Sequence, residues 1–293
     1  MATGAAVVSA AGAGVVALAL VFAPQERLVW QPPRFGRADP APPPADARRL
    51  EYAASDGQRL FAWVVEPPGG DVAGTLLAFH GNAELAAWSV PWARQVARRT
   101  GWRVVLPEYR GYDGLGGTIS HPHSRLDALA ALTVARTAMP GAADEPTVLY
   151  GHSLGSAVAA ELAESMATEG RPPSALVLES PFTSVRAMAR FGESPAMDRV
   201  WQRVARVHFD TQARVAALDA PVWVAHGLVD LVIPVQMGIA VHAAARRPGE
   251  LLLLGRAGHN DVVESGGERY WSWLARALGA VEHARPADAP TSR

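Results

Sequence analysis

The pattern of apolar and polar positions between residues 48 and 282 predicts strands that alternate with helices. Helical spacing of apolar residues covers residues 84–99, 124–138 and 154–167. Residues 49–54 and 59–66 flank the turn sequence SDGQ (55–58) and predict an antiparallel hairpin. Continuous apolar runs suit strands that are buried on both faces, and they occur at TLLAF (75–79), RVVL (103–106), TVLY (147–150), ALVL (175–178), VWVA (222–225) and LLLL (251–254).

This order of elements predicts one α/β domain over residues 48–282. Its central sheet is mostly parallel, with helices on both faces, and the hairpin adds an antiparallel edge. Residues 182–218 interrupt the alternation and have helical spacing near Trp201 and Val204. We predict a short helical cap insertion there, over the carboxyl edge of the sheet. The alternative is one ordinary crossover helix with long loops.

The two ends of the chain differ from this domain. Residues 2–23 carry no charge and are mostly Ala, Val, Leu and Gly. Because a spanning helix needs about 20 such residues, residues 1–24 predict an N-terminal transmembrane anchor. A cleaved signal peptide, giving a secreted form, is the alternative. The basic residues Arg27, Arg34 and Arg37 follow the segment and favour a cytoplasmic domain. Residues 25–47 predict a Pro-rich linker and residues 283–293 a disordered tail.

Composition then narrows the chemistry. The 293 residues include no Lys and no Cys, and the net charge is −1. A Lys nucleophile, a P-loop lysine, a thiol nucleophile and a disulfide framework are therefore excluded. The basic residues are scattered, which argues against nucleic acid as a partner. No motif requires a cofactor or a metal, so we expect neither.

Ser153 is the leading candidate for a nucleophile. It stands in GHSLG (151–155), between the predicted strand TVLY and a predicted helix, which is the context of a nucleophile elbow. A serine on such a sharp turn is held in a strained backbone conformation. The flanking Gly151 and Gly155 let the strand and the helix approach closely.

His259 and Asp230 are the candidates for the base and the acid that a serine nucleophile needs. With Ser153, they follow predicted strands in the order Ser, Asp, His, at the edge where open α/β sheets place their sites. His259 acts as the general base in this hypothesis, and Asp230 orients its imidazole. Asp261 is the alternative acid, although it follows His259 too closely to reach behind the ring. As structural alternatives, Asp230 caps the helix near Pro234 and His259 is an ordinary loop residue.

Two backbone N–H groups are candidates for an oxyanion hole. One is that of Leu154, directly after the nucleophile, and the other is that of Asn82 in the loop after TLLAF. Gly81 permits the tight turn that aims the second donor. The alternative is an ordinary strand-to-helix turn in which His80 packs beneath the site as a structural group.

Several motifs together resemble one known family, the membrane-anchored α/β-hydrolase-domain proteins that include the bud-emergence-related serine hydrolases and, more distantly, protein depalmitoylases. The resemblance implies the α/β-hydrolase fold, a triad of Ser153, Asp230 and His259, an oxyanion role for the HGN turn, a small cap and an N-terminal membrane helix. The motifs are QERL (25–28), FHGNAE (79–84), EYRGY (108–112), GHSLGSAVA (151–159), ESPFTS (179–184), HGLVDLVIP (226–234) and GHND (258–261).

One stretch departs from the family pattern. After RGY, residues 113–127 read DGLGGTISHPHSRLD, in which His121 and His123 replace the usual start of a helix. Two histidines separated by one proline suggest metal binding only faintly, and we interpret them as loop residues. The departure affects the substrate rim on this side and leaves the chemistry intact.

These features predict a serine hydrolase that cleaves carboxylic esters or thioesters through an acyl-enzyme. The substrate is a small molecule, a lipid or a lipidated protein. An acyltransferase or an amide or peptide hydrolase on the same triad is the alternative, because the same residues serve each reaction. A non-catalytic, membrane-tethered binding module is the alternative from another class.

Overall fold

The computed structural model describes residues 25–33, 44–45, 47–139, 141–189 and 205–283. Within them lies an eight-stranded sheet of order β1-β2-β4-β3-β5-β6-β7-β8. Strand β2 pairs antiparallel with β1 and β4, and the remaining pairs are parallel. The strands are β1 (Arg48–Ala53), β2 (Arg59–Val65), β3 (Thr75–Phe79), β4 (Arg103–Pro107), β5 (Thr147–His152), β6 (Ala175–Glu179), β7 (Pro221–Gly227) and β8 (Arg247–Leu254).

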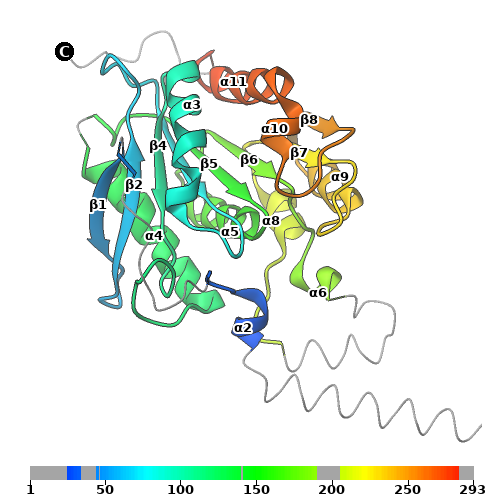
Figure 1. Cartoon of the computed structure of the whole chain (residues 1–293), viewed down its shortest axis with the longest axis horizontal. Coiled ribbons are helices and arrows are strands. Elements are labelled where there is room, and N and C mark those ends of the chain that lie inside the picture. The colour runs from blue at the N-terminus through cyan, green and yellow to red at the C-terminus, as the bar shows by residue number, and fades with distance from the viewer. Residues whose placement is uncertain (1–24, 34–43, 46, 140, 190–204, 284–293) are drawn as a thin grey trace, which may run out of the picture.

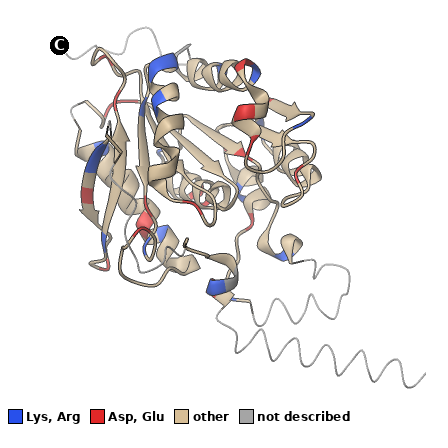
Figure 2. Ribbon diagram, in the orientation of Figure 1, with Lys and Arg blue, Asp and Glu red and all other residues tan. Residues whose placement is uncertain are grey.

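Helices cover both faces of this sheet (Figure 1). Helices α3 (Val90–Thr100), α10 (Val262–Gly266) and α11 (Glu268–His283) contribute to the core on one face. Helices α4 (His121–Thr137), α5 (Leu154–Thr168), α8 (Thr211–Ala217) and α9 (Val235–Ala243) contribute to the core on the other. The predicted α/β-hydrolase fold, a mostly parallel sheet between two helical layers, is confirmed. Basic and acidic positions are interspersed over these elements (Figure 2).

The strands read as continuous apolar runs because both of their faces are covered. In β3, Leu76 and Ala78 belong to the core beneath α3 and α11, whereas Leu77 and Phe79 belong to the core on the opposite face. Successive side chains of a strand point to opposite faces, so a strand between two helical layers needs an apolar residue at every position. Every residue of β4, β5 and β6 is also buried, including the polar residues Arg103, His152 and Glu179 at their ends.

The helix predicted over residues 84–99 begins later than its pattern suggests. Residues 84 and 85 lie in a loop, a short 3-10 helix η1 (Ala86–Ser89) follows, and α3 begins only at Val90. The reason is Pro91, which has no backbone N–H to donate into a preceding turn and therefore fits only the first turn of a helix. Gly101, at a φ of 72°, ends α3.

The prediction that His121 and His123 are loop residues is wrong. Helix α4 begins at His121, because the Ser120 side chain caps it by accepting a hydrogen bond from the backbone N–H of His123, and Pro122 occupies the first turn. His121 Nε2 lies 2.7 Å from Glu161 Oε1 on α5. His123 Nδ1 lies 2.9 Å from the carbonyl oxygen of Thr118.

The predictions for the N-terminal residues need two corrections. Residues Gln25–Val29, assigned above to a linker, form a one-turn helix, α2. The predicted anchor at residues 1–24 lies outside the described residues, and no helix in the described ranges is long and apolar enough to cross a membrane. The predicted localisation, a membrane-anchored chain, is corrected accordingly.

Two other predicted segments lie only partly within the described residues. In the predicted cap insertion, α6 (Val185–Met188) and α8 are described, and residues 190–204 are not. The predicted tail at residues 283–293 begins at the last residue of α11, and residues 284–293 lie outside.

Candidate active site

Ser153 occupies the sharp turn between β5 and α5. Its backbone has φ 51° and ψ −117°, a conformation that an L-residue adopts only when its surroundings impose it. The flanking glycines explain how the turn closes. A Cβ at Gly151 would collide with the carbonyl oxygen of Gly155, and a Cβ at Gly155 would collide with that of Phe79. The serine hydroxyl therefore stands at the carboxyl edge of the sheet, before the first turn of α5.

Two further predicted residues meet Ser153 at this edge. His259, in the loop after β8, has its Nε2 2.9 Å from Ser153 Oγ. Its Nδ1 lies 2.8 Å from Oδ2 of Asp230, in the loop after β7. The three residues are up to 106 positions apart. They come together because parallel strands end at the same edge.

The Asp230 carboxylate is buried, and each of its oxygens accepts hydrogen bonds. Oδ1 accepts from the backbone N–H groups of Val232 and Ile233, both at 2.8 Å. Oδ2 lies 2.8 Å from His259 Nδ1 and 3.2 Å from His226 Nε2. Burial alone would raise the pKa of Asp230, but these donors hold its pKa well below the usual range. Asp230 is therefore ionised whenever His259 takes up a proton.

His226 is a residue that the sequence reasoning missed. Its fully buried ring directs Nε2 at Asp230 and also at the carbonyl oxygen of Ile233, 2.9 Å away. Both neighbours are acceptors, so Nε2 carries the proton and donates. The available signal was a histidine four residues before the aspartate in HGLVD.

Asp261, the alternative acid, is engaged elsewhere. Its Oδ1 accepts from the backbone N–H of Gly258, and its Oδ2 accepts from the hydroxyl of Ser265, both at 2.6 Å. Asp261 therefore shapes the loop that carries His259, whereas Asp230 faces the imidazole Nδ1.

The two candidate oxyanion donors lie in the loop after β3 and at the start of α5. In the described part of the chain, no acceptor bonds the backbone N–H of Asn82 or of Leu154. The Asn82 side chain ties its loop to the surroundings. Its Oδ1 accepts from Gln31 N at 2.8 Å, Ala83 N at 3.0 Å and the Tyr112 hydroxyl at 3.1 Å.

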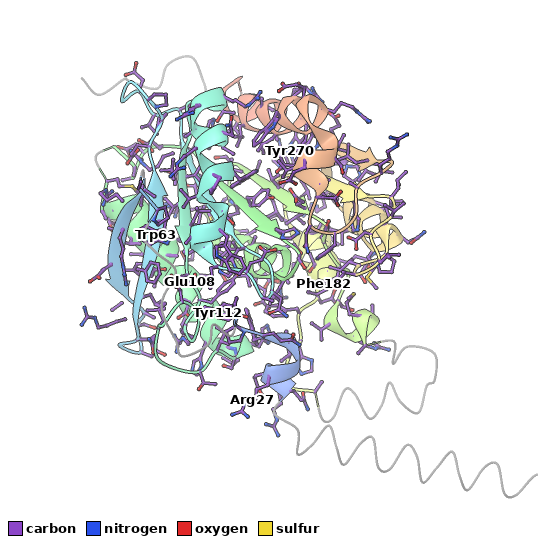
Figure 3. All side chains as sticks on the ribbon, in the orientation of Figure 1. Arg27, Trp63, Glu108, Tyr112, Phe182 and Tyr270 are labelled. Atoms are coloured by element: carbon purple, nitrogen blue, oxygen red, sulfur yellow. The ribbon has the colours of Figure 1, made fainter. Side chains whose placement is uncertain are left out.

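A buried histidine supports the same loop from beneath. His80 Nε2 lies 3.0 Å from Glu108 Oε1, and both side chains are almost inaccessible to solvent. Burial would lower the pKa of His80, but the adjacent Glu108 carboxylate outweighs it and raises the pKa. Glu108 also accepts from the backbone N–H groups of Ala86 and Tyr109. Tyr112, labelled with Glu108 in Figure 3, follows Glu108 by four residues in the segment after β4, and its hydroxyl donates to the Asn82 side chain of the supported loop.

The loop that carries Asp230 presents apolar side chains to solvent. Leu231 is 97% exposed, although Asp230 beside it is buried. Single exposed apolar residues are common on protein surfaces. Here four exposed apolar residues adjoin one another in the loop that carries Asp230: Leu228, Val229, Leu231 and Val232.

A family model described as a thioesterase domain matches residues 75–212. The chain is 31% identical to an uncharacterised protein of Mycobacterium tuberculosis over 266 residues. This alignment covers 87% of this chain and 87% of the relative. It is 29% identical to the lysophosphatidylserine lipase ABHD12 of Macaca fascicularis, over 52% of this chain and 40% of the relative. The human alpha/beta hydrolase domain-containing protein 17B is also 29% identical, over 69% of this chain and 64% of the relative.

Solved structures resemble this fold as well. An esterase from Pyrococcus furiosus has a TM-score of 0.65 at 17% identity, covering 85% of this chain and 98% of that one. An acetyl xylan esterase from Paenibacillus sp. R4 has a TM-score of 0.60 at 18% identity, covering 82% and 85%. The narrower resemblance to bud-emergence-related hydrolases stays a prediction. The chain belongs to the α/β-hydrolase family and resembles its esterases, thioesterases and lipases.

Proposed function

We propose that this protein is a serine hydrolase that cleaves carboxylic esters or thioesters through an acyl-enzyme. Ser153 is the nucleophile, His259 the general base and Asp230 the acid that orients it. The observation that carries the proposal is the continuous line of hydrogen-bond contacts from Ser153 Oγ through His259 to Asp230, at 2.9 Å and 2.8 Å. Neighbouring groups that contact one another in this order form the arrangement by which a base activates a serine.

The reaction follows from these atoms. His259 Nε2 accepts the hydroxyl proton as Ser153 Oγ attacks the acyl carbon, and the imidazolium is stabilised by the ionised Asp230. The backbone N–H groups of Leu154 and Asn82 receive the negative charge that develops on the carbonyl oxygen. His259 then protonates the leaving alcohol or thiol. Water attacks the resulting Ser153 ester with His259 again as base, which releases the carboxylic acid and restores the serine.

Two observations support an acyl ester or thioester as the substrate class. The matched family model is that of a thioesterase, and one relative is described as a lysophosphatidylserine lipase. The apolar rim formed by Leu228, Val229, Leu231 and Val232 adjoins the acid Asp230. Contact with such a surface removes apolar area of an acyl chain from water, which favours binding of the chain.

A fluorophosphonate probe tests the serine mechanism directly, because it labels only an activated serine. We expect the wild type to be labelled and Ser153→Ala to be unlabelled. Ser55→Ala, which removes an exposed hydroxyl in the turn between β1 and β2, is the matched control and should be labelled as the wild type is. A folded wild type that resists the probe, or a labelled Ser153→Ala, would contradict the proposal.

Paired acyl esters and acyl thioesters of increasing chain length then define the substrate class. We expect turnover of at least one series, with kcat/KM rising as the chain lengthens because the apolar rim contacts it. Labelling by the probe without turnover of either series would refute ester or thioester hydrolysis and favour the amide-hydrolase or acyltransferase alternative.

A further inference from the structure

A second set of polar contacts links the three loops around Ser153 without touching its hydroxyl. Glu84 Oε2 accepts a hydrogen bond from the backbone N–H of Gly81 at 2.9 Å. Glu84 Oε1 lies 3.1 Å from Nδ1 of His152. His152 Nε2 lies 3.2 Å from the backbone carbonyl oxygen of His259.

These residues belong to three different segments of the candidate site. Gly81 and Glu84 bracket the turn that carries Asn82 after β3. His152 is the last residue of β5, directly before Ser153. His259 is the proposed base in the loop after β8. One carboxylate and one imidazole therefore connect the oxyanion turn, the nucleophile elbow and the base loop.

The contacts also define the protonation state of His152. Its two ring nitrogens face a carboxylate oxygen and a carbonyl oxygen, and both of these groups only accept hydrogen bonds. A neutral imidazole has one N–H and can satisfy only one of them, whereas an imidazolium donates to both. The arrangement fits the cation.

We infer that Glu84 and the protonated His152 are positioning residues, which hold the oxyanion turn, the nucleophile elbow and the base loop in their mutual register. The inference rests on the proposed function. It assigns a task to the residue before the nucleophile and to the acidic residue after the HGN turn, neither of which touches the reacting atoms.

The surrounding charges agree with this assignment. Burial lowers the pKa of His152, but the hydrogen bond with Glu84 and the negative charges of Glu84 and Glu179 outweigh it and raise the pKa to about 9. Glu179, at the end of β6, pairs with His152 in the sheet register. Burial raises the pKa of Glu84, but His152 and, more weakly, His80 lower it to about 2. The pair is therefore ionised between about pH 2 and pH 9.

The pH dependence has a definite sign. A group with a raised pKa in the folded protein contributes its stabilisation below its ordinary pKa and loses it as the pH rises through the raised value. Above about pH 9, His152 loses a proton. One ring nitrogen then presents a lone pair to an acceptor, and a link between the loops is broken. We expect kcat of the wild type to fall as the pH rises through about 9.

Two substitutions at Glu84 separate charge from contact. In Glu84→Gln, the carboxamide oxygen still accepts from Gly81, and the carboxamide N–H donates to a neutral His152, which keeps its donation to His259. We expect near-normal kcat at pH 7.5 and no decline at pH 9. Glu84→Ala removes both contacts, and kcat should fall about tenfold to a hundredfold with little change in KM, because misplaced catalytic groups slow the chemical step.

Glu264→Ala is the matched control for the loss of a carboxylate, since Glu264 is an exposed residue of α10 close to the base loop. It should retain the wild-type pH profile. Circular dichroism and urea unfolding establish that each variant is folded. Histidine ¹⁵N NMR, with the His152 resonance assigned through His152→Gln, should show that His152 titrates near pH 9 in the wild type and at lower pH in Glu84→Gln.

The outcomes distinguish this inference from the proposed function. A wild type that neither reacts with the fluorophosphonate nor turns over acyl substrates refutes both. An active wild type overturns the inference alone if a folded Glu84→Ala keeps its kcat, or if the alkaline decline is identical in the wild type and Glu84→Gln.

Discussion

Asp230 and Asp261 lie on neighbouring loops, yet their carboxylates have different partners. Asp230 accepts hydrogen bonds from two backbone N–H groups and lies within hydrogen-bond distance of two imidazoles. Both oxygens of Asp261 accept hydrogen bonds from Gly258 and Ser265 instead. An acid that orients a base must reach the imidazole nitrogen on the side away from the nucleophile. Only Asp230 makes that contact with His259 among the residues described.

Asparagine substitutions test this distinction. In Asp230→Asn, an amide NH₂ group replaces one carboxylate oxygen, although the groups around Asp230 are themselves N–H donors. His259 therefore loses the acceptor that selects its tautomer. If the proposed triad operates, we expect kcat to fall by about 10⁴ with a small change in KM, the effect of the equivalent substitution in a Ser-His-Asp protease. Asp261→Asn keeps an acceptor for Gly258 and should lose far less activity. Steady-state kinetics measure both, and a larger loss in Asp261→Asn would reverse the assignment.

At the scale of elements, the strand-turn-helix unit around Ser153 depends on close backbone contact between β5, α5 and β3. The absence of a side chain at Gly155 lets α5 begin against the carbonyl of Phe79. In the middle of an exposed helix, in contrast, glycine only increases the entropy that folding must overcome. The same substitution therefore has opposite consequences at different positions of this chain.

We expect Gly155→Ala to lower the free energy of unfolding by about 1–3 kcal/mol through overpacking, and to impair turnover by displacing the elbow. Gly279→Ala in α11, where an added Cβ meets nothing within 4 Å, is the control and should raise stability by up to about 1 kcal/mol. Urea unfolding followed by tryptophan fluorescence measures both. Equal effects of the two substitutions would contradict the steric explanation of the elbow.

Helix starts illustrate what local sequence predicts and where it falls short. Apolar spacing located α3 and α4, but it placed the first boundary before the actual start and the second one after it. Pro91 sets the start of α3, and Ser120 with Pro122 sets the start of α4. Both signals are present in the sequence. Helical periodicity does not detect them, because it identifies the apolar face of a helix and not the residues that satisfy the backbone groups at its end.

At the scale of the whole molecule, the segment after residue 24 packs onto the carboxyl edge of the sheet. Trp30 is 2% exposed, with its ring 5.4 Å from that of Tyr109 and 6.0 Å from that of Phe209. The next residue, Gln31, donates its backbone N–H to the Asn82 side chain, 51 positions away. Residues 25–33, the N-terminal arm, thus help to support the turn that carries Asn82.

Trp30→Ala tests that support. Removing a buried tryptophan typically costs about 3–5 kcal/mol, and the loosened arm should also lower kcat by releasing Asn82. Trp30→Phe keeps an aromatic ring and removes an indole N–H that has no partner in the described part of the chain, so it should be nearly neutral. Urea unfolding and kinetics measure the two variants. Unchanged stability in Trp30→Ala would show that the arm is not docked in solution.

The sequence by itself determined the order of strands and helices, the elbow with its two glycines, and the set of Ser153, Asp230 and His259 as candidates. Local signals suffice for these because periodicity, turn chemistry and motif spacing act over a few residues. Only the tertiary structure decided that Asp230 and not Asp261 faces His259, that Glu84 contacts His152, and that Trp30 packs against the core. Each of these depends on a hydrogen bond or a packing contact between residues far apart in the chain, and the folded sheet is what brings them within reach.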